Sequence, residues 1–177
     1  MKTIICILCL GMFGFVAVDS RADDVENAGS VLRVVIPAAA FSLTYGLDDK
    51  TGRHQFYKSF LSATVTTYGL KNIIEKESPD GRDNHSFPSG HSAMAFSGAS
   101  FIHRRYGLKY GAPAYAGAVF VGYSRIHADK HDGVDVCTGA LIGLAGTWIF
   151  TKPLKHPVEV SPLASGDTIG LILRTAW

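Results

Sequence analysis

Residues 84–96 read Asn-His-Ser-Phe-Pro-Ser-Gly-His-Ser-Ala-Met-Ala-Phe, and positions 88–91 hold the run Pro-Ser-Gly-His. This run is typical of a helix start, with proline ahead of the helix and Ser89 as its N-cap. Gly90 lets an anion approach the backbone, and the free N–H groups of a first helical turn favour phosphate there. His91 would then border the anion site, where it can protonate a departing oxygen. A plain helix cap with an exposed histidine is the alternative.

A second motif follows downstream and consists of Ser124-Arg125, five residues, His131, three residues, and Asp135. Arg125 can form two parallel hydrogen bonds with phosphate oxygens. His131 and Asp135 are four residues apart, so on a helix they meet on one face. A carboxylate on one ring nitrogen fixes the histidine tautomer and leaves the other nitrogen free for nucleophilic attack. The alternatives are a surface His–Asp pair and a metal site shared with His127, which no further ligand cluster supports.

A third segment lies upstream of both motifs. Lys71 closes an apolar run, and the turn Ser78-Pro79-Asp80-Gly81-Arg82 follows it. A lysine at the end of a helix adds positive charge beside an anion site, although lysine is also common there as a capping residue. This segment is therefore informative only together with the other two.

The chain contains five apolar runs after its N-terminus, each bounded by breakers or charged residues. Their lengths and their Leu, Ala, Met and Phe content favour helices over strands. Hydrophobic residues make up 47% of the chain and charged residues only 18%, against about 25% in a typical globular domain. The sequence therefore predicts an all-α bundle of about five main helices, embedded in a membrane. The runs are Val31–Leu47, Tyr57–Ile74, Ser92–Phe101 extending to His103, Ala112–Ser124 and Val134–Phe150.

Hydropathy and the charge of the loops give different predictions about whether the helices span a membrane. None of the runs reaches the ~20 clean apolar residues of a spanning helix, and Arg33 and Pro37 interrupt the first run. Gly139 and Gly143 allow close helix packing in lipid or in a soluble bundle. The loops rich in Lys and Arg alternate with those that carry the two motifs, which obeys the positive-inside rule. This pattern favours a membrane protein with both motifs on its outer side.

The N-terminus predicts export. Lys2 precedes the apolar residues 4–18, and Ser20-Arg21-Ala22 has small residues at the recognition positions, so residues 1–22 are predicted to be a signal peptide. An uncleaved membrane anchor is the alternative. Residues 23–155 would then be the helical domain, and residues 156–177 a tail with the β-branched character of a short strand. Cys137, the only cysteine after the signal, is expected to be buried.

Together, the three segments resemble the type 2 phosphatidic acid phosphatase (PAP2) superfamily, in its bacterial membrane-associated or periplasmic branch, which also contains class A acid phosphatases and vanadium haloperoxidases. The family pattern is Lys, six residues, Arg-Pro, then Pro-Ser-Gly-His, then Ser-Arg, five residues, His, three residues, Asp. The second and third parts match in full between Pro88 and Asp135. The first part departs, because Ser78 stands where the family has arginine. Arg82 is the expected substitute for that phosphate clamp, and Lys76 is a weaker one.

The resemblance implies a two-step transfer in which His131 attacks phosphorus, Asp135 orients His131, and His91 first protonates the leaving oxygen and then activates water. It implies no metal or other cofactor. The phosphate oxygens would be held by Lys71, Ser89, Gly90 and Arg125.

The function implied is a metal-independent phosphatase for a lipid phosphate or diphosphate at the periplasmic face of the inner membrane, in contact with membrane lipid. One alternative is a soluble periplasmic acid phosphatase for small phosphomonoesters, and another is a vanadate-dependent oxidant enzyme. A non-catalytic phosphate- or lipid-binding protein is a further alternative, which Ser78 alone supports. Nucleic acid is not an expected partner, since the net charge is only +2.

Overall fold

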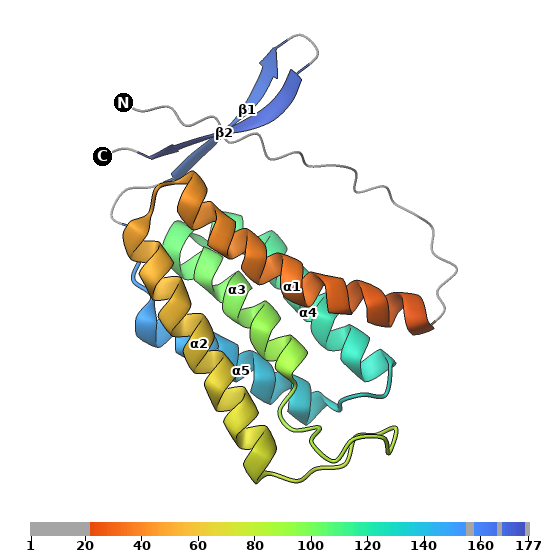
Figure 1. Cartoon of the computed structure of the whole chain (residues 1–177). Helices are drawn as coiled ribbons and strands as arrows, with labels where there is room; N and C mark the ends of the chain where they lie inside the picture. Colours follow the sequence, from red (N-terminus) through yellow and green to blue (C-terminus); the bar gives the residue numbers. More distant parts are fainter. Residues whose placement is uncertain (1–21, 155–157, 166–167, 176–177) are drawn as a thin grey trace.

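The structure, a computed structural model, describes residues 22–154, 158–165 and 168–175. Within these residues, five helices lie side by side as a bundle (Figure 1). The prediction of an all-α bundle of about five main helices is confirmed. The predicted signal peptide lies, except for Ala22, outside the described residues. The helices are α1 (Ala22–Gly46), α2 (Lys50–Ile73), α3 (Gly90–Tyr106), α4 (Leu108–His127) and α5 (Gly133–Phe150).

The tail after the bundle forms a β-hairpin in which β1 (Val158–Ser165) and β2 (Thr168–Thr175) pair in antiparallel fashion. The sequence indicates only one short strand here, and the structure contains two. The division of the chain into a domain of residues 23–155 and a tail stays a prediction.

Helices α1 and α2 begin well before the apolar runs that predict them. The first turns of both helices are polar, so hydropathy does not detect them. At α2 the cause is local, because the side chain of Asp49 accepts a hydrogen bond from the Gly52 amide at 2.8 Å and caps the helix.

Helix α3 occupies the centre of the bundle, where it packs against the other four helices (Figure 1). Small residues allow this. A Cβ added at Gly143 would lie 2.5 Å from the carbonyl oxygen of Ala93, and one at Gly139 would lie 2.3 Å from that of Ser89. The two glycines on α5 therefore bring its backbone into direct contact with the start of α3. This contact fixes where the first turns of both helices meet.

Two helices are long and apolar enough to cross a membrane, namely α1 from Asp24 to Gly46 and α5 from Gly133 to Phe150. Only 28% of each apolar window is buried inside the protein, so these are not core helices. Large apolar side chains such as Val31, Leu141 and Ile149 are exposed. An exposed apolar surface of this kind is typical of a contact with another protein or a membrane, and it agrees with the predicted membrane embedding.

Cys137 corrects one expectation from the sequence, because it is exposed rather than buried. The inner face of α5 carries Asp135, Gly139 and Gly143, and Cys137 lies on another face of the helix. The apolar run that predicts burial is buried on one side only.

A buried ion pair closes the end of the bundle that lies opposite the start of α3. The guanidinium of Arg105, in the last turn of α3, donates to both carboxylate oxygens of Asp49 at 2.6 and 2.5 Å. The two side chains are only 6% and 5% exposed. Arg105 also donates to the carbonyl of Lys152 at 2.9 Å, beyond the end of α5. One arginine thus ties the ends of α2, α3 and α5 together.

Replacing Arg105 with methionine should destabilise the fold, because Asp49 would stay buried without its cation. Loss of one partner from a buried ion pair costs about 3–5 kcal/mol. Thermal unfolding in detergent, followed by circular dichroism, measures the effect. The control is Arg82→Met, since the Arg82 side chain is 79% exposed. Equal melting temperatures for the two variants would contradict a stabilising role for the pair.

Candidate active site

The sequence-predicted site residues come from three segments that meet at one end of the bundle. These are the loop between α2 and α3, the first turn of α3, and the stretch from the end of α4 to the start of α5. Ser89 joins two of them, because its backbone N–H donates to the carbonyl of Asp135 at 2.9 Å. The predicted motifs are therefore brought together in space.

The start of α3 has the predicted cap. Ser89 is fully buried, and its hydroxyl accepts hydrogen bonds from the backbone N–H and the hydroxyl of Ser92 at 3.5 and 3.2 Å. Gly90 is the first helical residue and is half-buried. The amides of this first turn carry the positive end of the helix dipole. The end of α3 is accordingly suited to an anion.

His131 and Asp135 form the predicted pair. His131 Nδ1 lies 3.5 Å from Asp135 Oδ2, and the side chains are 11% and 0% exposed. The hydroxyl of Ser86 lies 3.2 Å from the same nitrogen and donates to the same carboxylate oxygen. Both of these contacts of the imidazole use Nδ1, which leaves Nε2 for attack on a substrate.

Lys76 supplies the positive charge opposite Asp135. Its ammonium donates to Asp135 Oδ1 at 2.6 Å and to Asp132 Oδ2 at 2.7 Å. Burial opposes the charge on this lysine, but the hydrogen bonds to Asp132 and Asp135 outweigh burial and raise the pKa of Lys76. Lys76 thus keeps Asp135 ionised rather than clamping a phosphate.

His91 and Arg125 form the other half of the site. His91 Nε2 lies 3.4 Å from Arg125 Nη1. Arg125 is buried and donates to the carboxylate of Glu26 at 3.3 Å and to its carbonyl at 2.6 Å. Burial, then the charges of Arg125 and Arg33, lower the pKa of His91 to about 3. His91 is therefore neutral in the free protein.

The environment of His131 also favours the neutral imidazole. Burial and then the positive charge of Lys71 lower the pKa of His131, against the opposing effect of Asp135. Lys71 itself is half-buried and donates to the carbonyls of His85 and Ser86 at 2.5 and 3.3 Å. It therefore both holds the loop that carries Ser86 and keeps His131 in the form that can act as a nucleophile.

Arg82 is the one predicted site residue that the structure does not bring to the cluster. Its side chain is 79% exposed, and its nearest acidic partner is Asp80, 4.0 Å away. Ser78, at the position of the family arginine, is buried and donates to Asp80 at 2.6 Å. Asp80 also accepts from Lys130 at 2.8 Å, which holds the turn against the α4–α5 loop. The substitution of Arg82 for the missing clamp stays a prediction, and the structure gives it no support, because the Arg82 side chain is directed to solvent.

Three residues that contact the candidate site were not found, or were given another role, from the sequence. Ser86 and Lys76 contact Asp135 across more than forty residues of sequence, and no local pattern indicates such contacts. Glu26 on α1 binds Arg125 and lies outside all three motifs. Among the described residues there is no group of three or more His, Cys, Asp or Glu side chains suited to a metal ion.

The comparisons with known proteins agree with this geometry. Residues 40–155 match the family model of the PAP2 superfamily. The chain is 30% identical over 141 residues to the lipid A 4'-phosphatase of Helicobacter pylori strain J99, covering 73% of this chain and 71% of that protein. It is 41% identical over 106 residues to a lipid A 1-phosphatase of Porphyromonas gingivalis, covering 54% of this chain but only 24% of that larger protein.

The fold has a counterpart among solved structures. A crystal structure of Aquifex aeolicus LpxE has a TM-score of 0.63 and 24% sequence identity, and the likeness covers 72% of this chain and 83% of that one. At this identity the likeness concerns the fold alone.

Replacing Lys71 with methionine should raise the pKa of His131 toward the ordinary histidine value of about 6.5, because the Lys71 charge is the second cause of its depression. In the wild type, His131 stays neutral as the pH falls through 6.5; in the variant it should protonate at a higher pH. Histidine NMR titration measures this. Lys58→Met, at the other end of the same helix, is the control. An unchanged His131 pKa in Lys71→Met would contradict the assignment.

Proposed function

Because this chain belongs to the PAP2 superfamily, we propose that it is a metal-independent phosphatase that hydrolyses a lipid phosphate or diphosphate through a phosphohistidine. The observation that supports this mechanism is that one histidine has an acidic neighbour and the other has a basic neighbour. His131 is held by a buried carboxylate, and His91 lies beside a buried arginine. One side therefore suits a nucleophile and the other suits phosphate binding and proton transfer.

In the first step, His131 Nε2 attacks phosphorus, and a nitrogen–phosphorus bond forms as the bond to the leaving oxygen breaks. Asp135 stabilises the positive charge that develops on the imidazole. His91 gives its proton to the leaving alkoxide. Although His91 is neutral in the free protein, a bound phosphate places negative charge beside it, which raises its pKa and favours the protonated form.

In the second step, water attacks phosphorus while His91 accepts its proton, and the nitrogen–phosphorus bond breaks to release inorganic phosphate. Arg125, Lys71 and the amides at Gly90 would stabilise the charge on the equatorial oxygens in both steps. After the second step His91 again carries its proton and His131 is free of phosphorus. Each turnover therefore consumes one water molecule.

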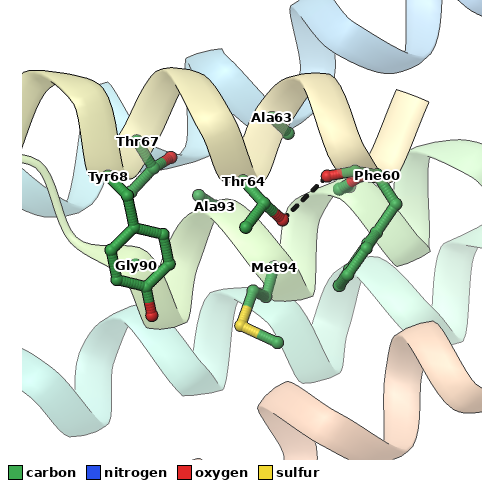
Figure 2. A pocket seen from close by; sticks show the side chains of 9 residues that line it. Phe60, Ala63, Thr64, Thr67, Tyr68, Gly90, Ala93 and Met94 are labelled. Atoms are coloured by element: carbon green, nitrogen blue, oxygen red, sulfur yellow. Dashed lines mark hydrogen bonds between the residues drawn. The ribbon is translucent and has the colours of Figure 1, made fainter. Parts of the chain in front are cut away.

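A lipid substrate is supported by the surroundings of the site. The relatives are named lipid A phosphatases. A mainly apolar pocket between α2 and α3 reaches Gly90, with Phe60, Tyr68 and Met94 among the side chains that line it (Figure 2). The pocket is too small to enclose a hydrocarbon chain, but it places apolar side chains beside the first turn of α3, where the phosphate would bind.

We also propose that the site faces the periplasm from the inner membrane. The turns at the opposite end of the bundle carry Lys50, Arg53, Arg104, Lys109 and Lys152. Basic residues of short loops favour the cytoplasmic side. The site would then lie on the outer side, where an exported lipid presents its phosphate.

The decisive experiment is phosphate release by the purified protein in detergent with EDTA present, from a panel of lipid phosphates, lipid diphosphates and p-nitrophenyl phosphate. His131→Ala should lower release by roughly 10³-fold or more, as loss of a nucleophile does in other covalent enzymes. A rapid quench should trap an acid-labile phosphoenzyme in the wild type and none in the variant. Arg82→Ala, outside the cluster, should retain wild-type activity.

Other results would redirect the proposal. Release that disappears with EDTA would contradict the metal-independent mechanism. Activity on p-nitrophenyl phosphate alone would indicate an acid phosphatase for small monoesters. No release from any substrate would leave a phosphate- or lipid-binding protein, in which Ser78 has removed an essential clamp.

A further inference from the structure

One face of α1 is directed at the site. Glu26, Gly29, Arg33 and Ile36 are spaced by three, four and three residues, which places them in one line along a helix. Glu26 binds Arg125. A Cβ added at Gly29 would lie 2.6 Å from Ser124 Cβ and 3.5 Å from Arg125 Nη2. This part of α1 therefore packs directly on the end of α4 that carries the phosphate-binding arginine.

The same face continues into the core beyond Arg33. Ile36 is buried, and its Cδ1 would lie 3.1 Å from a Cβ added at Gly117 on α4. Arg33 follows Gly29 by one turn and precedes Ile36 by one turn. Arg33 thus lies between Gly29 and Ile36, which both pack on α4. It is therefore on the face of α1 that is turned toward α4.

Arg33 has a buried donor without a partner. Its Nε is buried and forms no hydrogen bond, and no ion pair of Arg33 is found among the described residues. Arg33 as a whole is half-buried. The two buried arginines differ from it, because Arg105 binds Asp49 and Arg125 binds Glu26. A buried donor without a partner is costly, and an ionisable residue within an apolar helix is a candidate for a ligand site.

The charge of Arg33 acts on the site itself. After burial, which is the largest cause at both groups, the positive charge of Arg33 contributes to lowering the pKa of His91 and of Arg125. This agrees with its place on the same face of α1 as Glu26, which binds Arg125. Arg33, His91 and Arg125 are three groups that can bind an anion at this end of the bundle. Among the described residues, Glu26 supplies a negative charge beside them through its ion pair with Arg125. An anion with more than one negative charge would relieve this repulsion.

In the family pattern, the loop between α2 and α3 carries an arginine. In this chain, that loop brings no arginine to the site. Ser78 is hydrogen-bonded to Asp80, Arg82 faces solvent, and Lys76 is engaged by Asp132 and Asp135. We propose that Arg33 replaces the missing arginine and binds the phosphate of the substrate together with Arg125. The inference rests on the proposed function and names a phosphate clamp that lies outside residues 40–155, the region matched by the family model.

The test compares the wild type with Arg33→Met and Arg33→Lys. Two quantities are measured for each protein: kcat/KM on the preferred lipid phosphate, and the rise in melting temperature produced by inorganic phosphate or orthovanadate. Arg33→Met should lower kcat/KM by about 10²–10³-fold, as loss of one preorganised donor does, and should abolish the stabilisation by both anions. Arg33→Lys should recover part of each.

Arg53→Met is the matched control. Arg53 is also half-buried with an unpartnered Nε, but it lies over the ring of Tyr45 near the start of α2, at the opposite end of the bundle. It should leave both readouts unchanged. If Arg33→Met does not fold, Arg33→Gln gives the same reading, because the amide keeps hydrogen-bond donors and loses the charge.

The outcomes separate this inference from the proposed function. An active wild type whose Arg33→Met variant stays within threefold in kcat/KM and keeps its stabilisation by phosphate would overturn the role of Arg33 and leave the phosphatase intact. An inactive wild type would overturn the proposed function. In that case, loss of phosphate stabilisation in Arg33→Met would still support the anion site, and its persistence would overturn it.

Discussion

The buried carboxylate of Asp135 is the constraint on which the rest of the site depends. A fully buried charge is tolerated only when polar groups surround it. Asp135 receives hydrogen bonds from Lys76, Ser86 and the backbone N–H of Asp132. Two of these partners come from the α2–α3 loop and one from the start of α5. Satisfying one carboxylate therefore brings together the segments that carry the chemistry, and the orientation of His131 follows from it.

The other half of the site, around His91, is dominated by positive rather than negative charge. The cations that act on His91 are Arg125, Arg33 and Lys71, and Glu26 is the counter-charge of Arg125. Both histidines have lowered pKa values in the free protein, each first because of burial and then because of neighbouring cations. The difference lies in the carboxylate, which opposes the shift only at His131. Substrate phosphate would supply the missing negative charge at His91, so binding and proton transfer are linked by the same electrostatics.

The sequence predicts those parts of this arrangement that depend on local spacing. The cap at Ser89 and the pairing of His131 with Asp135 follow from helix geometry, and the structure contains both. The helical class, the PAP2 family and the hydrolase type are confirmed. Lys76 and Ser86 could not be assigned, because their contacts depend on how the α2–α3 loop folds back onto α5. Arg82 was assigned from proximity in sequence, which says little about orientation in a turn, and its side chain is directed to solvent.

Arg33 shows how a local irregularity acquires meaning only from the tertiary fold. In the sequence it is a charged residue that interrupts an apolar run, and alone it argues against a membrane helix. In the structure, Arg33 shares a face of α1 with Glu26, which binds Arg125, and its buried Nε has no partner. A clamp that comes from a helix rather than a loop is held by packing along the whole of α1, including the contacts of Gly29 and Ile36. Its position is therefore coupled to the membrane-facing helix, and the phosphate site is connected mechanically to the surface that meets the lipid.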